Sequence, residues 1–425
     1  RSTLFPYTTL FRSGRRMYVT INFKIRLDLG VSVMKSLERI DRKIEEELEC
    51  FSDMAIHIAR NPEISEKEFQ TSAMLVQALR ERGFSVEYPY AGLATAFNAV
   101  RKNKKTPVVA FMAEYDALPE IGHACGHNLN GVMSVLAGTA LAEVLADDLT
   151  GEIRVVGTPA EETNGAKVAM ADTGVFDDVD FAMMVHGGSG GEAHPLYRAL
   201  ALVPVEFDFR GRPAHAAAAP WEGLNALNGL QLFYHALDML RQHVKPDTRI
   251  HGVITKGGDA PNIVPDFAQA SFYFRSPSRN YLETVLEKAF DCARGAALAT
   301  GTEAVWHHNG TIFHEILPNT EVESLMMEIL EELKIPYSPQ PYWSGSTDVG
   351  NVSWKCPTMH LGLPLCDAFV PLHTREFAAL AADRKYVVKI VETGAKAMAR
   401  MGLRVLQSSD TRAKMRENLK KAQGA

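Results

Sequence analysis

Residues 113–128 contain the side chains of the chain with the clearest capacity for chemistry. Cys125 and His127 lie two positions apart in a glycine-containing turn, and Asp116 precedes them. A thiolate, an imidazole and a carboxylate can share one divalent metal ion. Because a lone cysteine or histidine is more often part of a core, the prediction of a metal site depends on this combination. Asp116 is placed to hold a ligand histidine by a hydrogen bond; otherwise it would be an ordinary turn aspartate.

Two adjacent carboxylates, Glu161 and Glu162, follow the apolar run 153–156. Neighbouring carboxylates at the end of a strand repel each other unless a cation or solvent relieves them. One of them can bind a metal ion while the other takes a proton from a water that the ion activates. The competing interpretation is a solvated turn, which the predicted ligands at 113–128 make less attractive.

Two further histidines are weaker candidates for metal ligands. His186 ends the apolar run 181–185, and His373 lies in a loop that leads into a helix. A histidine at the carboxyl end of a strand is well placed to bind a second metal ion. Taken alone, His186 is explained equally well as a structural residue, and His373 is a weak candidate.

Three polar residues in the middle of the chain could contact a substrate. His215 follows a strand in the turn 211–217 and could stabilise an oxyanion, or it could simply cap a helix. Asn262 and Arg275 could hold a carboxylate, the arginine through two parallel hydrogen bonds. The polar loop 345–351 could line a pocket or form a plain turn.

The elements that must position these residues follow from the apolar pattern. Apolar residues recur at three- and four-residue steps from about residue 34 to 58, which predicts an amphipathic helix. A second helix is expected over 65–82, with Ser65 as its N-cap. The run 107–113 is apolar on both faces, like a central strand covered by helices. Further strands are predicted at 94–101, 152–158 and 181–186, and a helix at 129–146. This alternation predicts a doubly wound α/β sheet with its site at the carboxyl ends of the strands.

Residues 201–311 follow a different order: strand, helix, strand, strand, helix, strand. That βαββαβ order predicts a small, inserted, ferredoxin-like α+β domain. Its first helix, 222–243, carries more apolar residues than one sheet face needs, and a dimer contact is one explanation. The α/β pattern then returns, so the catalytic domain is expected to be discontinuous, over 34–200 and 312–405. A charged tail, 406–425, is expected to form a frayed helix.

The composition excludes several classes of protein. The chain has 425 residues, 46% hydrophobic and 23% charged, with a net charge of −6, so neither nucleic acid nor an anionic membrane is an expected partner. No apolar run approaches the ~18 residues that span a bilayer. Five scattered cysteines favour a reducing compartment over a disulfide framework. Residues 1–33 are interpreted as a non-native or disordered leader, with Met34 or Met17 as the natural start.

These motifs resemble the dinuclear-metal aminoacylase and carboxypeptidase family of peptidases. Within it they are most similar to an amidohydrolase branch that includes p-aminobenzoyl-glutamate hydrolases, indole-acetyl-amino-acid hydrolases and β-alanyl-lysine-type dipeptidases. The similarity covers about residues 40–403. It is carried most specifically by 113–128, less specifically by Thr158–Glu162, and is supported by 211–215 and 257–265.

The resemblance implies a role for each candidate residue. It assigns two divalent ions to five ligands: Cys125, His127, Glu162, His186 and His373. It makes Glu161 the general base and the inserted domain a dimerisation or lid domain. The histidine of that domain, here His215, is expected to reach an active site, often across the dimer. Asn262 and Arg275 match positions implicated in substrate binding.

The chain departs from the family pattern at two positions. Many members have aspartate where this chain has Asn128, and many have Asp-Met-Asp in place of residues 114–116. The string 346–351 is similar to the p-aminobenzoyl-glutamate and dipeptidase subgroup. These features favour that subgroup over plant-type auxin-conjugate hydrolases and leave the acyl group open.

The sequence therefore predicts a cytoplasmic, metal-dependent amidohydrolase or peptidase that is a homodimer through its inserted domain. Its substrate would be an N-acyl amino acid or a dipeptide-like amide with a free carboxylate. Zinc or manganese is expected, and cobalt or nickel would also suit the ligand set. A deacylase or carboxypeptidase for another acyl group, a catalytically silent metal-binding protein and a structural scaffold remain as other interpretations.

Overall fold

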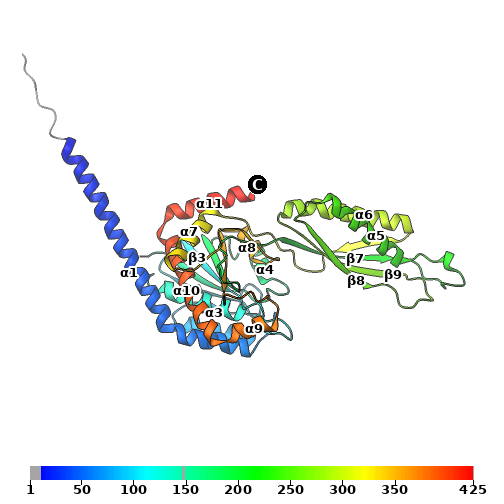
Figure 1. The fold of residues 1–425 in the computed structure, drawn as a ribbon, viewed down its shortest axis with the longest axis horizontal. Coiled ribbons are helices and arrows are strands. Elements are labelled where there is room, and N and C mark those ends of the chain that lie inside the picture. Colours follow the sequence, from blue (N-terminus) through cyan, green and yellow to red (C-terminus); the bar gives the residue numbers. More distant parts are fainter. Residues whose placement is uncertain (1–10, 146–148, 425) are drawn as a thin grey trace, which may run out of the picture.

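The computed structural model describes residues 11–145 and 149–424, with side chains from residue 34 onward. Figure 1 shows two parts of unequal size: a larger one with helices around a sheet, and a smaller one that projects away from it. A six-stranded and a four-stranded sheet form the centres of these two parts. A short third sheet pairs β6 (Tyr197–Arg198) with β11 (Tyr342–Trp343).

The larger part is built on a mixed sheet whose strands lie in the order β1-β2-β4-β3-β5-β12. Its parallel strands are β3 (Val108–Ala113), β4 (Glu152–Gly157), β5 (Phe181–Gly188) and β12 (Thr358–Pro364). Two antiparallel strands complete one edge: β1 (Ser85–Glu87) and β2 (Phe97–Lys102). Because parallel strands end at the same edge of a sheet, residues that follow β3, β4 and β5 are brought together there.

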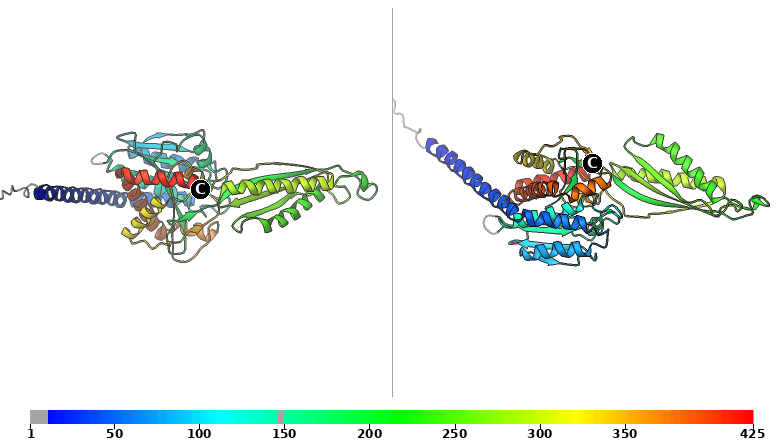
Figure 2. Two further views of the ribbon diagram at one scale, coloured as in Figure 1. Left: turned by 90° about the horizontal axis from the view of Figure 1, so that it is seen from above. Right: turned by 60° about the horizontal axis from the view of Figure 1, so that its bottom comes forward.

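Helices cover both faces of this sheet, as the sequence predicts. Every residue of β3 is buried, and alternate residues enter different cores, Val109 and Phe111 on one face and Ala110 and Met112 on the other. The first core includes residues of α1 (Phe11–Arg60), α2 (Phe69–Glu81), α3 (His127–Ala142), α7 (Thr320–Glu332) and α10 (Arg384–Gln407). The second includes residues of α4 (Ala166–Asp172) and α8 (Val349–Ser353). Figure 2 shows the layers from two further sides. The predicted α/β architecture is confirmed.

Glycines allow α3 to approach the sheet closely. Its N-cap, Gly126, has φ +81°, a left-handed conformation that strongly favours glycine. A Cβ atom on Gly131 would lie 2.7 Å from the Glu114 carbonyl oxygen. The helix therefore begins at His127 and lies directly against the end of β3.

The smaller part confirms the predicted βαββαβ order. Its antiparallel sheet has the order β10-β7-β9-β8. The elements are β7 (Ala201–Arg210), α5 (Ala226–Leu240), β8 (Arg249–Lys256), β9 (Phe267–Ser276), α6 (Arg279–Thr300) and β10 (Glu303–His307). The two helices pack on the sheet around a separate phenylalanine-rich core, which includes Phe207, Phe233 and Phe272.

The two connections between the parts run side by side. Leu202, at the start of β7, and Phe313, on the return to the larger part, exchange backbone hydrogen bonds of 2.9 and 3.0 Å. The inserted part is therefore attached through a short two-stranded ribbon.

Three local details differ from the sequence predictions. α1 begins at Phe11 rather than near residue 34. Ser65 is not a helix cap, because Glu68 is the N-cap of α2 and the Ser65 hydroxyl donates to Asp116. The tail forms α11 (Ser409–Gln423), whose Met415 is fully buried against the main core instead of fraying.

The domain boundaries and the leader over 1–33 stay predictions. Residues 1–10 lie outside the described part of the chain, and of 11–33 only the backbone is described. Among the residues that the structure describes, no helix combines the length and apolar character needed to cross a membrane.

Candidate metal centre and active site

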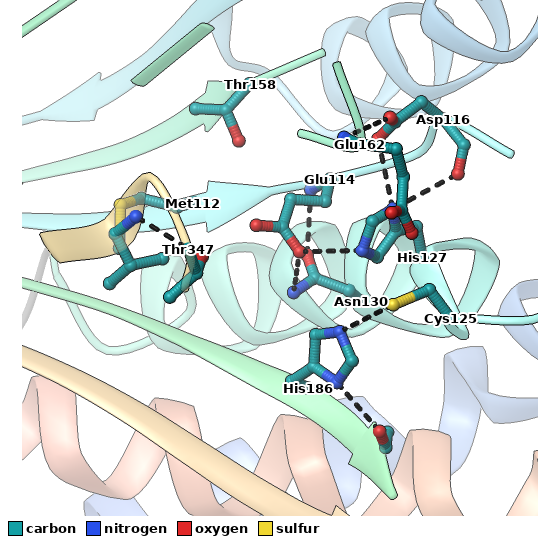
Figure 3. Close-up of polar contacts among 12 residues, drawn as sticks. Met112, Glu114, Asp116, Cys125, His127, Asn130, Thr158, Glu162, His186 and Thr347 are labelled. Carbon is teal, nitrogen blue, oxygen red and sulfur yellow. Dashed lines mark hydrogen bonds and ion pairs between the residues drawn. The ribbon is translucent and has the colours of Figure 1, made fainter. Parts of the chain in front are cut away.

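The two predicted motifs meet at the carboxyl ends of β3, β4 and β5. The string with Cys125 and His127 follows β3, the glutamate pair follows β4, and His186 lies near the end of β5. Figure 3 shows Cys125, His127, Glu162 and His186 close together, with their side chains turned toward one another. The sheet topology thus brings together residues that are far apart in the sequence.

Cys125 lies between two histidines. Its Sγ is 3.4 Å from Nε2 of His186 and 3.5 Å from Nε2 of His373. The second histidine is also 3.7 Å from Oε2 of Glu162. His373 lies in a loop and has a φ of +61°. Its backbone N–H donates a hydrogen bond to the Ala124 carbonyl. That bond fixes the last predicted ligand next to the first motif.

His127 is fully buried and oriented by Asp116. Its Nδ1 donates to Oδ1 of Asp116 at 3.0 Å, while its Nε2 has no hydrogen-bond partner and lies 3.4 Å from Oε2 of Glu114. A carboxylate that holds one ring nitrogen in this way aims the other nitrogen at a metal. Asp116 also accepts hydrogen bonds from the Ser65 hydroxyl and the Glu162 backbone. Burial opposes its ionisation, but His127 and these donors keep the pKa of Asp116 well below its usual range.

The two glutamates have different surroundings. Oε1 of Glu162 is buried without a hydrogen-bond partner. Burial first, and then the charges of Glu114 and Asp348, raise the pKa of Glu161 well above its usual value. A carboxyl group with a raised pKa is a competent acceptor and later donor of a proton.

These residues fit a divalent metal centre. Potential ligand atoms lie within 4.8 Å of one another in three overlapping groups: Cys125, His127 and His186; Cys125, Glu162 and His373; and His127, Glu161 and Glu162. Unpartnered buried atoms on His127 and Glu162 are costly unless a cation binds them. The structure brings together all five residues predicted as ligands, with the predicted base beside them.

A buried lysine next to the site was not predicted. Lys167, on α4, is fully buried and its Nζ lies 2.6 Å from both Glu114 Oε1 and Asp348 Oδ1. Together with Glu161, these two acids form a further group of metal-ligand type. Because the ammonium lies between two of the three carboxylates, it supplies the positive charge there.

A row of aromatic rings leads away from the site and was also not predicted. His186 stacks on His360 with ring centroids 5.6 Å apart, and His360 lies 3.9 Å from the ring of Tyr197. Tyr342 follows at 5.5 Å from Tyr197, and His194 lies 4.1 Å beyond it. Burial lowers the pKa of His360 to about 3, so its imidazole is neutral.

The predicted substrate-binding residues of the inserted part fall at opposite ends of it. Arg275, near the end of β9, lies at the attachment, where its Nη1 donates to the Ser346 hydroxyl at 3.1 Å. Its Nε is buried without a partner. Arg275 is thus beside the polar loop 345–351, which lies against the inserted part.

His215 and Asn262 lie together at the far tip, away from the metal cluster of the same chain. Both are exposed, and the Ala216 N–H donates to the Asn262 carbonyl at 3.0 Å. Backbone N–H groups of Ala217 and Ala218 donate to Nδ1 of His215, which leaves its Nε2 as the donor. Ten residues of β7 separate the tip from the attachment, about 30 Å at the usual rise of ~3.3 Å per residue. Figure 1 shows this tip as the end of the molecule remote from the larger sheet.

The sequence matches the profile of peptidase family M20/M25/M40 over residues 110–403. Among curated proteins, it is 34% identical over 409 residues to the Xaa-Arg dipeptidase of Mus musculus, covering 89% of this chain and 91% of that protein. It is 29% identical over 410 residues to one of the subunits of the p-aminobenzoyl-glutamate hydrolase of Escherichia coli (strain K12), covering 79% of this chain and 85% of that protein.

A solved structure shares the fold. A dinuclear metal-binding peptidase of Bacillus subtilis superposes with a TM-score of 0.65 at 18% sequence identity, covering 85% of this chain and 99% of that one. At this identity the likeness concerns the fold, including a large α/β part and an inserted smaller one.

Proposed function

The chain belongs to peptidase family M20/M25/M40, and on that premise we propose that it cleaves the amide bond of a dipeptide or N-acyl amino acid that carries a free carboxylate. It is a hydrolase of amide or peptide bonds, and its family is metal-dependent. The observation that carries the proposal is the convergence of five potential ligands, two of which have buried atoms without a hydrogen-bond partner. They lie directly beside Glu161, whose carboxyl group has a raised pKa.

Two divalent ions, zinc or manganese, would be held by Cys125, His127, Glu162, His186 and His373. When bound, such ions polarise the amide carbonyl and make water easier to deprotonate. Glu161 takes the proton of the attacking water and later delivers it to the leaving amine. Asp116 keeps Nδ1 of His127 protonated and thereby presents Nε2 to the centre.

Arg275 is the proposed contact for the substrate carboxylate. It lies at the attachment of the inserted part, and its Nε is buried without a hydrogen-bond partner, which a charged acceptor would supply. A guanidinium can hold a carboxylate through two parallel hydrogen bonds. Substrates without a free carboxylate are therefore expected to be poor.

A homodimer is the second element of the proposal, since one chain leaves His215 out of reach of its own cluster. β8 is an edge strand with seven of its eight residues exposed, including Val253 and Ile254. An exposed apolar edge of this length is suited to pairing with another strand. Leu232 and Met239 add exposed apolar surface on α5. Pairing with a second copy would carry the tip of one chain, with His215 and Asn262, to the other chain's centre.

The five free cysteines suit the cytoplasm.

The test is amine release from a panel of amides. Alanyl-arginine, β-alanyl-lysine, p-aminobenzoyl-glutamate and N-acetyl amino acids are each incubated with chelated protein and with protein to which zinc or manganese is restored. Metal-dependent cleavage of at least one class is expected, and its absence with Glu161→Gln would assign the base.

A matched control is Glu120→Gln, which removes an exposed carboxylate from the string 113–128 that contains Cys125 and His127. It should retain activity. If metal-loaded wild-type protein cleaves no member of the panel, the proposed function is wrong. Exclusive cleavage of N-acetyl amino acids would identify a deacylase in place of a dipeptidase.

A further inference from the structure

A further group of carboxylates lies beside the proposed metal centre, and the proposed mechanism uses only one of its members. Potential ligand oxygens of Glu114, Glu161 and Asp348 lie within 4.8 Å of one another. Buried carboxylates at such distances repel one another strongly unless a cation is close to them. In the other three groups of potential ligands that cation would be a divalent ion, whereas in this group the chain supplies its own, the buried ammonium of Lys167.

The ammonium is bound by two of the three acids. Nζ of Lys167 lies 2.6 Å from Oε1 of Glu114 and 2.6 Å from Oδ1 of Asp348. The backbone N–H of Lys167 donates to the second carboxylate oxygen of Asp348 at 3.1 Å. Two of the three N–H groups of the ammonium are thus directed to Glu114 and Asp348. Asp348 is held through both of its oxygens by one residue.

The local fold is shaped to bring the lysine to these acids. Lys167 is the second residue of α4, and Asp348 is the N-cap of α8. The N-cap of α4, Gly165, has φ +60°, and a Cβ atom there would lie 2.6 Å from the ring of Phe313 and 3.0 Å from Cβ of Asp348. A glycine is therefore required for the start of α4 to approach Asp348 this closely.

Glu114 is also held from its other side (Figure 3). Nδ2 of Asn130 donates to Oε2 of Glu114 at 3.4 Å, and the backbone N–H of Glu114 donates to Oδ1 of Asn130 at 2.8 Å. The same Oε2 lies 3.4 Å from Nε2 of His127, a proposed ligand. Glu114 is therefore close enough to the proposed centre to compete for an ion, and Lys167 engages its other oxygen.

We propose that Lys167 occupies a position that an additional metal ion would otherwise take, and that it thereby keeps Glu161 free to act as the base. A divalent ion that favours oxygen ligands, such as manganese, could bind all three carboxylates. A carboxylate oxygen bound to such an ion is a poor proton acceptor. An ammonium supplies positive charge without forming a coordinate bond to Glu161.

Lys167 is on this interpretation a positioning residue, which acts through Glu114 and Asp348. The inference rests on the proposed role of Glu161 as general base and explains how that carboxylate avoids becoming a ligand. It also concerns the number of ions that the chain binds, which can be measured without turnover.

The competing explanation is that Lys167 only stabilises the fold. Both explanations predict a loss of stability when the ammonium is removed, because the two acids then lack a partner. They differ in what remains after its removal. If the lysine excludes an ion, its loss leaves a metal site behind; if it is only structural, the number of bound ions does not change.

The experiment counts ions in the full-length wild type, in Lys167→Met and in Lys355→Met, the control that removes an exposed lysine next to α8. Each protein is dialysed against excess manganese and then against metal-free buffer, and its manganese content is measured by elemental analysis. Lys167→Met should retain one ion more per chain than the wild type, and Lys355→Met should match the wild type. Addition of Glu161→Gln to Lys167→Met should return the count to the wild-type value, because the additional ion needs that carboxylate.

Activity supplies a second readout, measured as amide cleavage at increasing manganese concentration. In Lys167→Met the rate should rise as the proposed centre fills and then fall about 10²-fold or more as the additional ion binds Glu161, which corresponds to loss of general base catalysis. The wild type and Lys355→Met should stay at their maximum over the same range.

Several results would overturn the inference. One is an unchanged ion count in Lys167→Met, and another is an additional ion that persists when Glu161→Gln is added. Full activity of Lys167→Met with the additional ion bound would also contradict it. If Lys167→Met folds only when manganese is present, the refolded protein should contain the additional ion; failure to fold even then means that an ion cannot replace the ammonium. If the wild type cleaves no amide, the proposed function is wrong, and the ion counts still decide whether Lys167 excludes a metal.

Discussion

The metal cluster and the tip of the inserted part contain residues predicted for one reaction, yet they are built differently. In the cluster, each functional group touches others: His127 is fully buried, and Asp116 receives hydrogen bonds from three separate segments. At the tip, His215 and Asn262 are exposed and their contacts are with nearby backbone. The first region is complete within one chain, whereas the second is an exposed surface that, in the proposed dimer, would act at the centre of the other chain.

This difference separates two ways in which a fold can place a chemical group. The carboxyl ends of the parallel strands lie at one edge of the sheet and place the ligands there. Burial and hydrogen bonding therefore orient the ligands before any substrate arrives. The antiparallel insert instead carries its polar tip about 30 Å from the attachment. Substitutions in the cluster should therefore act within a chain, and substitutions at the tip should act between chains.

The largest effect is expected for Glu161→Gln. Loss of the general base should lower kcat by about 10³- to 10⁴-fold, while the metal content, measured by elemental analysis, stays at the wild-type value. Because Gln cannot accept the proton but keeps the shape, a loss of metal together with activity would contradict the division between base and ligands.

The next largest effect is expected for removal of the buried ammonium group of Lys167. Lys167→Met leaves Glu114 and Asp348 as unpaired buried charges, and breaking such a pair typically costs about 3–5 kcal/mol of the free energy of unfolding. Urea denaturation measures it. The matched triple variant Lys167→Met with Glu114→Gln and Asp348→Asn removes the charges together and should recover much of that loss; equal stability of the two variants would mean that the lysine is not balancing the carboxylates.

The tip is tested by mixing two inactive variants. His215→Ala should cut kcat by about 10²-fold or more without changing metal content, as expected for loss of an oxyanion donor. When it is unfolded and refolded with Glu161→Gln, mixed dimers contain one site with both residues intact if His215 acts across a two-fold interface. About a quarter of wild-type activity should return. No recovery, with dimers verified by light scattering, would contradict the proposed action of His215 across the dimer.

The smallest effect concerns His360, in the row of aromatic rings beside the site. It is a loss of stability that appears only in acid. The folded pKa of His360 is about 3, against about 6.5 in an unfolded chain. Below pH 6.5 the unfolded state binds the extra proton, so stability contributed by the neutral ring is present above that pH and lost as the pH falls. Between pH 6.5 and 5, metal-free wild type should lose about 1–2 kcal/mol more than His360→Phe. Parallel pH profiles would show that the imidazole is not held neutral.

The sequence predicts those parts of the site that are local in the chain. Cys125 and His127 are two residues apart and Glu161 and Glu162 are adjacent, so their chemistry can be recognised without a fold. The strand pattern then explains why the two motifs meet. Even the weaker candidates His186 and His373 lie beside Cys125, because both stand at the ends of elements that lead to the same sheet edge.

The remaining contacts depend on packing that no short pattern encodes. Lys167 falls on a short helix where a lysine is normally solvated, and only the fold places it between acids 53 and 181 residues away. Ser65 has the spacing of a helix cap, but its hydroxyl donates to Asp116, and the first N–H groups of α2 at Gln70 and Thr71 donate to the Glu63 carboxylate. The row from His360 to Tyr342 joins separate segments of the chain, so its members look like ordinary core residues in the sequence.

The paired backbone at Leu202 and Phe313 has a mechanical consequence. A connection this narrow can act as a hinge, because only a few residues there would have to absorb the change in backbone angles when the inserted part rotates. With a lever arm of about 30 Å, a rotation of roughly 10° would displace the far end by about 5 Å. Small motions at the ribbon would thus be amplified at the far end, and a proline or glycine introduced there should change the timing of the catalytic cycle before it changes the chemistry.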